Sequence, residues 1–318
     1  MKLAASVPDQ DWERGPVALK FQIGDVMLGE VRLTLYRRSA RLEEHELDVD
    51  DTPRGPQSAQ GTDGFVVWSQ PIAARLPVLR VRGGAIIYVP RQYRRFSVDL
   101  SGSFAEYMAQ FSGKTRSSLK RKLRRFAELS QGKIHWKEYR TPREIEEFIL
   151  LARALSAKTY QERLLNYGLP ATREFLASAQ ALANQDCVRA YLLFLGGEPI
   201  SYLYCPIRGG VVLYDRLGYD PAHAAASPGT VLQLLVLETL FAERRFLLFD
   251  FTEGEGQHKE LFATGSRLCA DVYVLTRRFG IGSVVLLHRA TDKTSAAIGI
   301  TLDRLRLKSS MRRLIRRN

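Results

Sequence analysis

Hydrophobic residues after Phe104 recur at three- and four-residue spacing, which is the pattern of a helix with one buried face. We expect two helices there, the second beginning at Ser112 or Thr115. Another helix is predicted over residues 141–160, because its first residues, Thr-Pro-Arg-Glu, supply a cap, a proline at the first helical position and the glutamate of a capping box. Residues 171–183 continue as a further amphipathic helix.

The pattern then changes to alternation, which predicts strands. Glycine-containing turns separate three runs, 188–195, 200–207 and 211–219, and these predict an antiparallel meander. A helix, a buried strand, a short helix and a last strand follow over 227–240, 246–251, 257–263 and 269–275. The apolar run 281–287 is interpreted as a buried element.

Residues 1–112 are predicted to form an N-terminal lobe that contains a sheet. Short strands are expected within 17–35 and at 65–69, 78–81 and 85–89, bounded by Pro and Gly signals. Residues 48–64 hold almost no apolar side chains and are interpreted as a long loop or joint. Residues 113–280 then form the main domain, and 281–318 are a C-terminal extension.

The composition is that of an ordinary globular protein. Of the 318 residues, 45% are hydrophobic and 25% are charged, which excludes a wholly disordered or fibrous chain. The three cysteines are widely spaced and form neither a disulfide framework nor a zinc pattern, so we expect no metal. No apolar run reaches the roughly 18 residues of a membrane-spanning helix. We therefore expect a cytoplasmic protein.

The net charge of +13 is concentrated in two segments. Residues 101–160 hold 13 Lys and Arg against 6 Asp and Glu, and residues 301–318 hold 7 against 1. Such localised basic surfaces attract phosphate-bearing partners. The second segment also carries an apolar stripe at helical spacing, so it is predicted to be a basic amphipathic helix on the anionic inner face of the membrane. A helix docked on the domain, with exposed arginines, is the alternative.

Residues 227–230, Ser-Pro-Gly-Thr, follow a predicted strand and open a predicted helix. Unpaired N–H groups and the positive end of the helix dipole make such a start a binding site for an anion. The alternative is that Ser227 merely caps the helix and Pro228 occupies its first turn.

Three carboxylates, a histidine and a lysine follow the buried strand in the sequence Phe-Asp-Phe-Thr-Glu-Gly-Glu-Gly-Gln-His-Lys. Such side chains can accept and donate protons in catalysis. Asp250 is the preferred base, with Glu253 and His258 as substitutes, and Lys259 pairs with Asp250 or binds an acceptor phosphate. A structural Asp250 that caps the following turn, and solvated His258 and Lys259, are the alternatives.

Four stretches together resemble a known family: KTRSSLKRKLRRF (114–126), GGEPISYLY (196–204), LYDRLGYDPAHAAASPGTVL (213–232) and FDFTEGEGQHKELF (249–262). They are similar to the GNAT-type acyltransferase domain of the FemAB-like and CelD/BcsL-like proteins of bacterial envelope and exopolysaccharide biosynthesis. The resemblance covers about half the chain. It implies an α/β fold with a mixed, largely antiparallel sheet flanked by helices, and an N-terminal lobe that is a degenerate second lobe of the same kind.

The resemblance also implies a donor site. The pantetheine arm of coenzyme A would lie along Leu217, Gly218 and Tyr219, and its diphosphate at Ser227, Pro228, Gly229 and Thr230. Tyr219 or Tyr214 would protonate the thiolate, although packing alone also explains both. The usual Q/RxxGxG/A loop of these domains is absent, which leaves acetyl-coenzyme A and aminoacyl-tRNA both open as donors.

The expected activity is N-acyl transfer, with acetyl-coenzyme A as donor and no metal. The expected acceptor is a phosphorylated or lipid-linked amino sugar, and nucleic acid is a partner only if the donor is a tRNA. One rival is a Fem-type aminoacyl-tRNA-dependent transferase. The other is a GNAT-like sensor, without catalysis, of an anionic nucleotide.

Overall fold

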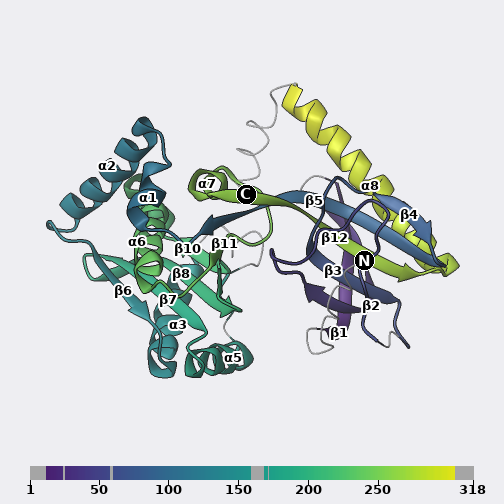
Figure 1. The fold of residues 1–318 in the computed structure, drawn as a ribbon, viewed down its shortest axis with the longest axis horizontal. Helices are drawn as coiled ribbons and strands as arrows, with labels where there is room; N and C mark the ends of the chain where they lie inside the picture. Colours follow the sequence, from purple (N-terminus) through teal and green to yellow (C-terminus); the bar gives the residue numbers. More distant parts are fainter. Residues whose placement is uncertain (1–11, 24–25, 58–59, 159–167, 171, 305–318) are drawn as a thin grey trace. The chain divides into compact units, whose positions relative to one another are not determined.

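The computed structural model describes residues 12–23, 26–57, 60–158, 168–170 and 172–304, with side chains up to 295 (Figure 1). The chain divides into two compact units. Unit 1 combines residues up to Arg94 with those from Arg267 onward, and unit 2 is Arg95–Ser266. The predicted boundaries at 112 and 280 differ from these, because β5 (Ala85–Asp99) and β12 (Gly265–Thr276) each contribute residues to both units.

Unit 1 is built on a sheet with one long helix. Its strand order is β1-β2-β3-β12-β5, with β4 paired to β5. The further bounds are β1 Glu13–Ile23, β2 Val26–Ser39, β3 Gly64–Pro71, β4 Leu79–Arg82 and α8 Phe279–Arg304. The predicted strands of this lobe are confirmed, and the described residues of 48–57 and 60–63 contain no strand. That this unit is a degenerate second GNAT-like lobe stays a prediction.

Unit 2 holds the remaining elements. Its helices are α1 Phe104–Ala109, α2 Gly113–Leu129, α3 Pro142–Ser156, α5 Arg173–Asn184, the 3-10 helix η2 Pro221–Ala226, α6 Pro228–Glu243 and α7 Gln257–Phe262. Its strands are β6 His135–Tyr139, β7 Val188–Leu195, β8 Glu198–Arg208, β9 Val211–Leu213, β10 Arg216–Tyr219 and β11 Leu248–Asp250. The sheet order is β6-β7-β8-β9-β11, with the end of β5 beyond β11 and β10 paired to β8. The predicted fold class, a mixed and largely antiparallel sheet flanked by helices, is confirmed.

Alternating side chains of the central strands separate two cores in unit 2. Tyr191 and Leu203 pack with α6 on one face, whereas Leu192 and Tyr204 pack with α3 and α5 on the other. α6 lies within the first core and is apolar on most sides, with Glu238 and Ala242 at exposed positions. α1 and α2 cover its outer side.

Two helix starts behave as their sequences predict. Ser112 caps α2 by accepting a hydrogen bond from the backbone N–H of Thr115 (3.2 Å). Thr141 and Glu144 form the expected capping box at the start of α3.

Four details of the sequence prediction were wrong. β6 was not predicted, and the predicted strand 246–251 is shortened to β11. The third meander strand is broken into β9 and β10. The run 281–287 is only partly buried, because α8 turns Leu286 and Leu287 outward. Residues 305–318, which carry most of the predicted basic amphipathic helix, lie outside the described residues.

Candidate acyl-transfer site

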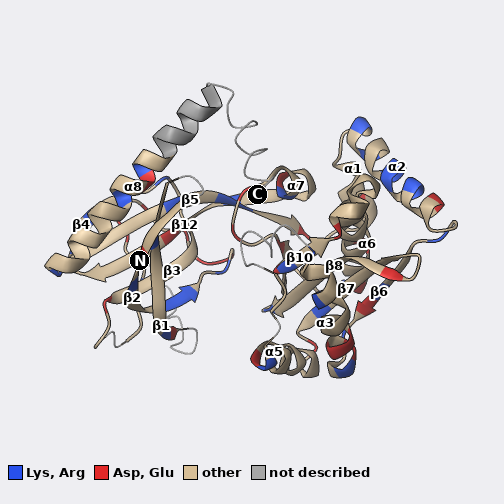
Figure 2. Cartoon of the chain, turned by 180° about the vertical axis from the view of Figure 1, so that it is seen from behind, with Lys and Arg blue, Asp and Glu red and all other residues tan. Residues whose placement is uncertain are grey.

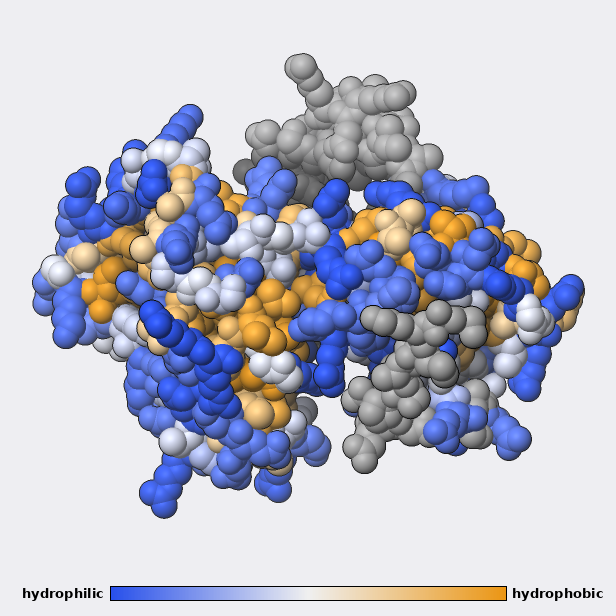
Figure 3. All heavy atoms as spheres, in the orientation of Figure 1, coloured by the Kyte–Doolittle hydropathy of each residue, from blue (hydrophilic) through white to orange (hydrophobic). Residues whose placement is uncertain are grey.

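The break between β9 and β10 separates two neighbouring strands of unit 2. β9 pairs in parallel with β11, with Val212 opposite Phe249. After Asp215 the chain continues as β10, which pairs with β8 alone among the described strands. The other edge of β10 therefore offers backbone N–H and C=O groups to an extended ligand. Figure 3 shows hydrophobic surface over this part of unit 2, where β10 and β11 lie.

The start of α6 follows β10 and η2. Ser227 has left-handed dihedrals (φ 54°, ψ 47°), and its side chain makes no capping hydrogen bond. The alternative in which the Ser227 hydroxyl simply caps the helix is therefore wrong. Pro228 has no N–H group, so the first amide groups of the helix belong to Gly229 and Thr230. This uncapped start is where a helix binds an anion most readily.

Lys122 of α2 lies beside that helix start. Its Nζ atom is 3.5 Å from Oγ1 of Thr230, and its side chain is half-buried. Lys122 lies three residues after the buried Leu119 on the same face of α2, which turns toward α6. Most other Lys and Arg residues of α2 are exposed, and Figure 2 shows them along the helix. The geometry thus distinguishes one lysine from a generally basic helix.

His258 and Tyr214 meet on another side of this region. The Nε2 atom of His258, on α7, is 3.4 Å from the hydroxyl of Tyr214, and its ring packs edge-on against Phe262. Burial, together with the positive charges of Lys122 and Lys259, lowers the pKa of His258 to about 4. The imidazole is therefore neutral at pH 7 and can accept a proton.

Asp250 does not face the same surroundings. It is buried and forms a two-pronged ion pair with Arg95 of β5: Nε donates to Oδ1 at 3.0 Å, and Nη2 pairs with Oδ2. Oδ1 also accepts the backbone N–H of Thr252 at 2.8 Å. This geometry matches the alternative in which Asp250 is structural and caps the following turn.

Lys259 and Glu253 lie on that turn and at the start of α7. Lys259 donates from Nζ to the carbonyl oxygen of Glu253 (2.5 Å), whereas the carboxylate of Glu253 is on an exposed residue. Burial lowers the pKa of Lys259 to about 8, against the opposing effect of Asp250 and Glu253. The partner of Asp250 in the structure is Arg95, and Lys259 acts on it only through its charge.

The residues proposed for the pantetheine arm all lie on β10. Leu217 packs against the core, and the carbonyl of Gly218 accepts a hydrogen bond from the Ser201 hydroxyl at 3.0 Å. Tyr219 is 41% exposed, and its ring would be 3.7 Å from a Cβ atom placed on Gly229. The ring of Tyr219 therefore lies over the first turn of α6.

The structure thus brings together Tyr219, Gly229 and Thr230, and it adds Lys122 at the same helix start. Sequence reasoning did not distinguish Lys122, because seven basic residues crowd α2 and only packing singles one out. It also missed Arg95, which is remote in sequence from Asp250. The burial of Asp215 at the break in the strand was likewise not visible in the sequence: burial raises its pKa, against the effect of Arg216 and Arg208.

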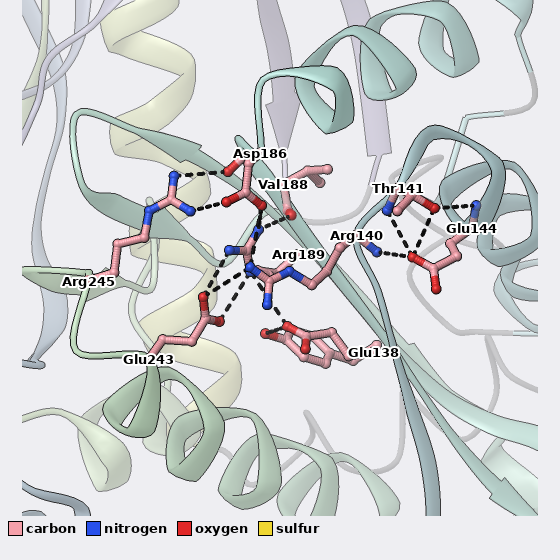
Figure 4. Close-up of polar contacts among 10 residues, drawn as sticks. Glu138, Arg140, Thr141, Glu144, Asp186, Val188, Arg189, Glu243 and Arg245 are labelled. Atoms are coloured by element: carbon pink, nitrogen blue, oxygen red, sulfur yellow. Dashed lines mark hydrogen bonds and ion pairs between the residues drawn. The ribbon is translucent and has the colours of Figure 1, made fainter.

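A second group of charged residues in unit 2 lies at the other end of α6 (Figure 4). Arg189 is completely buried and binds Glu243 through two hydrogen bonds of 3.1 and 2.9 Å and Asp186 through one of 2.7 Å. Although burial alone would raise it, hydrogen bonds from Arg189 and Arg245 hold the pKa of Asp186 at about 2. Because these groups satisfy one another, we interpret the network as structural.

The described residues contain no group of three or more His, Cys, Asp or Glu side chains placed to hold a metal ion. Nor does the described part of the chain contain a helix long and apolar enough to cross a membrane.

Comparison with known proteins identifies the class of this domain. Residues 113–260 match the family model described as "Acetyltransferase (GNAT) domain". This part of the chain is therefore a GNAT-type acyltransferase domain, and the protein is a transferase. No curated protein sequence matches the chain. Membership of the CelD/BcsL-like proteins stays a prediction.

Several solved structures are similar to this chain. L-PGS from Bacillus licheniformis is 14% identical, with 88% of this chain and 89% of that chain covered and a TM-score of 0.48. FemX is 11% identical, with 84% and 89% covered and a TM-score of 0.46. A GCN5-related N-acetyltransferase from Kribbella flavida is 12% identical, with 82% and 89% covered and a TM-score of 0.40.

Proposed function

We propose that this protein transfers an acyl group, in the first instance acetyl, from coenzyme A to an amino group of an envelope or exopolysaccharide sugar precursor. The observation that carries the proposal is the uncapped start of α6 with Lys122 beside it. Two amide groups, the helix dipole and one ammonium group converge there, and a diphosphate satisfies all of them. Separation of β10 from β11 supplies an edge along which the amide-containing pantetheine arm can pair.

The proposed reaction uses His258 as the proton acceptor. The acceptor's amine attacks the thioester carbonyl, a C–N bond forms, the C–S bond breaks, and the ammonium proton passes to the neutral imidazole. The hydroxyl of Tyr214 orients that imidazole through Nε2. Tyr214 is also the candidate that protonates the thiolate, because its hydroxyl lies beside His258, whereas the ring of Tyr219 lies at the diphosphate end of the site. In this assignment Asp250 positions the turn before α7.

A substitution at the helix start tests the donor site. Gly229→Trp should weaken acetyl-coenzyme A binding at least tenfold in a calorimetric titration and abolish thiol release. Gly229→Ala is the control, because its Cβ would make only an ordinary 3.7 Å contact with Tyr219. Unchanged binding and turnover in Gly229→Trp would remove the proposal. Binding of a nucleotide, with no heat from the thioester, would instead favour the sensor.

An aminoacyl-tRNA donor is the second candidate, and one observation favours it. Exposed Lys and Arg residues continue along α2 from the start of α6, which suits a polyanion larger than coenzyme A: Lys114, Lys120, Arg121, Arg124 and Arg125. A mobility shift with tRNA that weakens steeply with salt, together with no thiol release from acetyl-coenzyme A, would support this candidate over the first.

The proposed acceptor carries a phosphate, free or on a lipid carrier. The supporting observation is the positive charge of α2 and of residues 301–318, since both donor and acceptor would then be anionic. A panel of amino sugars, tested as free sugars and as nucleotide- or lipid-linked phosphates, would show the preference as a difference in kcat/KM.

A further inference from the structure

α8 packs against the sheet of unit 1 through one stripe of its surface. Ile281 and Val285 are buried in the core of the sheet, and His288 one turn later is also buried. The Nδ1 atom of His288 is 2.6 Å from the hydroxyl of Tyr88, and its ring packs edge-on against Phe21. This inner stripe fixes which side of the helix faces outward.

The outward stripe of α8 is apolar. Phe279, Leu286 and Leu287 are 94%, 58% and 59% exposed, and they lie on the side opposite the inner stripe. Figure 3 shows hydrophobic surface on the side of unit 1 where α8 and β4 lie. From Phe279 to Leu287 the stripe extends for about 12 Å along the helix. Large apolar side chains gathered on one exposed helix face indicate a binding surface.

The charges around this stripe are positive. The exposed positions of α8 up to residue 294 include no acidic residue, and the acidic Asp292 is half-buried and pairs with His288 at 3.1 Å. Arg277 and Arg278 precede the stripe and Lys293 follows it, all three exposed. In the sequence after α8, residues 305–318 add six Lys and Arg and no Asp or Glu.

We propose that the outward stripe of α8 docks on the surface of an anionic lipid bilayer. Helices that lie in the membrane interface insert an apolar face and surround it with cations, which is the arrangement found here. An anionic surface attracts the flanking charges, whereas a second copy of this chain would bring the same positive charges together. The membrane is therefore the occupant that fits both the apolar and the charged groups. This inference does not depend on the proposed acyl transfer.

Co-sedimentation of the full-length protein with vesicles tests the proposal. Vesicles that contain phosphatidylglycerol should bind the protein, and pure phosphatidylcholine vesicles should not. The double variant Leu286→Gln/Leu287→Gln should bind phosphatidylglycerol vesicles at least tenfold more weakly. The matched control is Leu129→Gln/Leu150→Gln, which removes two exposed leucines from unit 2 and should bind as the original protein does.

Three results would overturn the proposal. The Leu286→Gln/Leu287→Gln protein, the α8 variant, could bind vesicles as well as the original protein does. Deletion of residues 305–318 could abolish binding while the α8 variant retains it, which would make those residues the sole anchor. The original protein could be a dimer that the α8 variant converts to a monomer, without vesicle binding in either, which would make a second copy the occupant. Circular dichroism and thermal unfolding of each variant verify that it is folded.

Discussion

Arg95 and Asp250 form a buried, two-pronged ion pair that links β5 to the end of β11. Asp250 also holds the N–H of Thr252, a β-branched residue in the left-handed region (φ 58°). The Thr252 hydroxyl in turn donates to the carbonyl of Tyr214 (3.2 Å). Asp250 therefore fixes the turn that places α7, and with it His258, relative to Tyr214.

Asp250→Asn should destabilise the protein strongly. Removal of the carboxylate charge breaks the buried ion pair with Arg95, which costs about 3–5 kcal/mol of unfolding free energy. Chemical denaturation measures this loss. The double variant Arg95→Met/Asp250→Asn also removes the buried positive charge, and the Asn oxygen can still accept the hydrogen bond from the Thr252 N–H. Stability and thiol release should therefore largely return. A double variant that is stable yet inactive would show instead that Asp250 is the base the sequence suggested.

Lys122→Met should raise the KM for acetyl-coenzyme A about tenfold and change kcat little. A charge-assisted hydrogen bond contributes about 1.5–3 kcal/mol, and a contact made equally in the ground and transition states affects binding alone. Lys120→Met is the matched control, because that residue is exposed on the same helix. Equal effects of the two substitutions would mean that only the overall charge of α2 matters.

His258 should make the protein sensitive to acid. Its pKa is about 4 in the folded state against 6.5 as the ordinary value, so the unfolded chain binds the proton more readily between these pH values. The stability from the neutral imidazole is present above pH 6.5 and is lost as the pH falls toward 4. The loss amounts to about 3 kcal/mol.

Denaturation midpoints across pH 4–7 measure this sensitivity. His258→Gln should flatten the slope between pH 4 and 6.5, whereas His135→Gln, at an exposed position on β6, should leave it in place. Parallel slopes for the original protein and His258→Gln would contradict the lowered pKa.

Local signals in the sequence predicted the regular elements well. The capping box at Thr141 and the alternation along β7 and β8 are properties of a few consecutive residues, and both appear in the structure. β6 was missed because His135–Tyr139 is short and mixes charged residues with aromatic ones, which gives no clear strand pattern. The strand forms because it pairs with β7. The break at Asp215 was missed because it depends on the parallel pairing of β9 with β11.

The site could be predicted only in part for the same reason. The start of α6 was found because Ser-Pro-Gly-Thr is a local signal, although the left-handed Ser227 was not foreseen. Arg95 precedes Asp250 by 155 positions, and Lys122 precedes Thr230 by 108. No local pattern relates such pairs, so only the folded chain shows that Asp250 has a buried partner and that one lysine of α2 faces the helix start.

Arg189→Met should be the most destabilising substitution in the network of Figure 4. Arg189 is fully buried, and its loss would leave the partly buried Glu243 and Asp186 with Arg140, which is 3.5 Å from each and 40% exposed, at a cost of about 3–5 kcal/mol. Arg245→Met removes a cation that also pairs with Asp186, but its side chain is 46% exposed, so the cost should stay below about 1 kcal/mol. Urea denaturation of both variants measures the difference. Because Arg189 lies near the end of α6 remote from Gly229, acetyl-coenzyme A affinity of the folded Arg189→Met protein should be unchanged, and a selective loss of that affinity would mean that the network also positions the donor site.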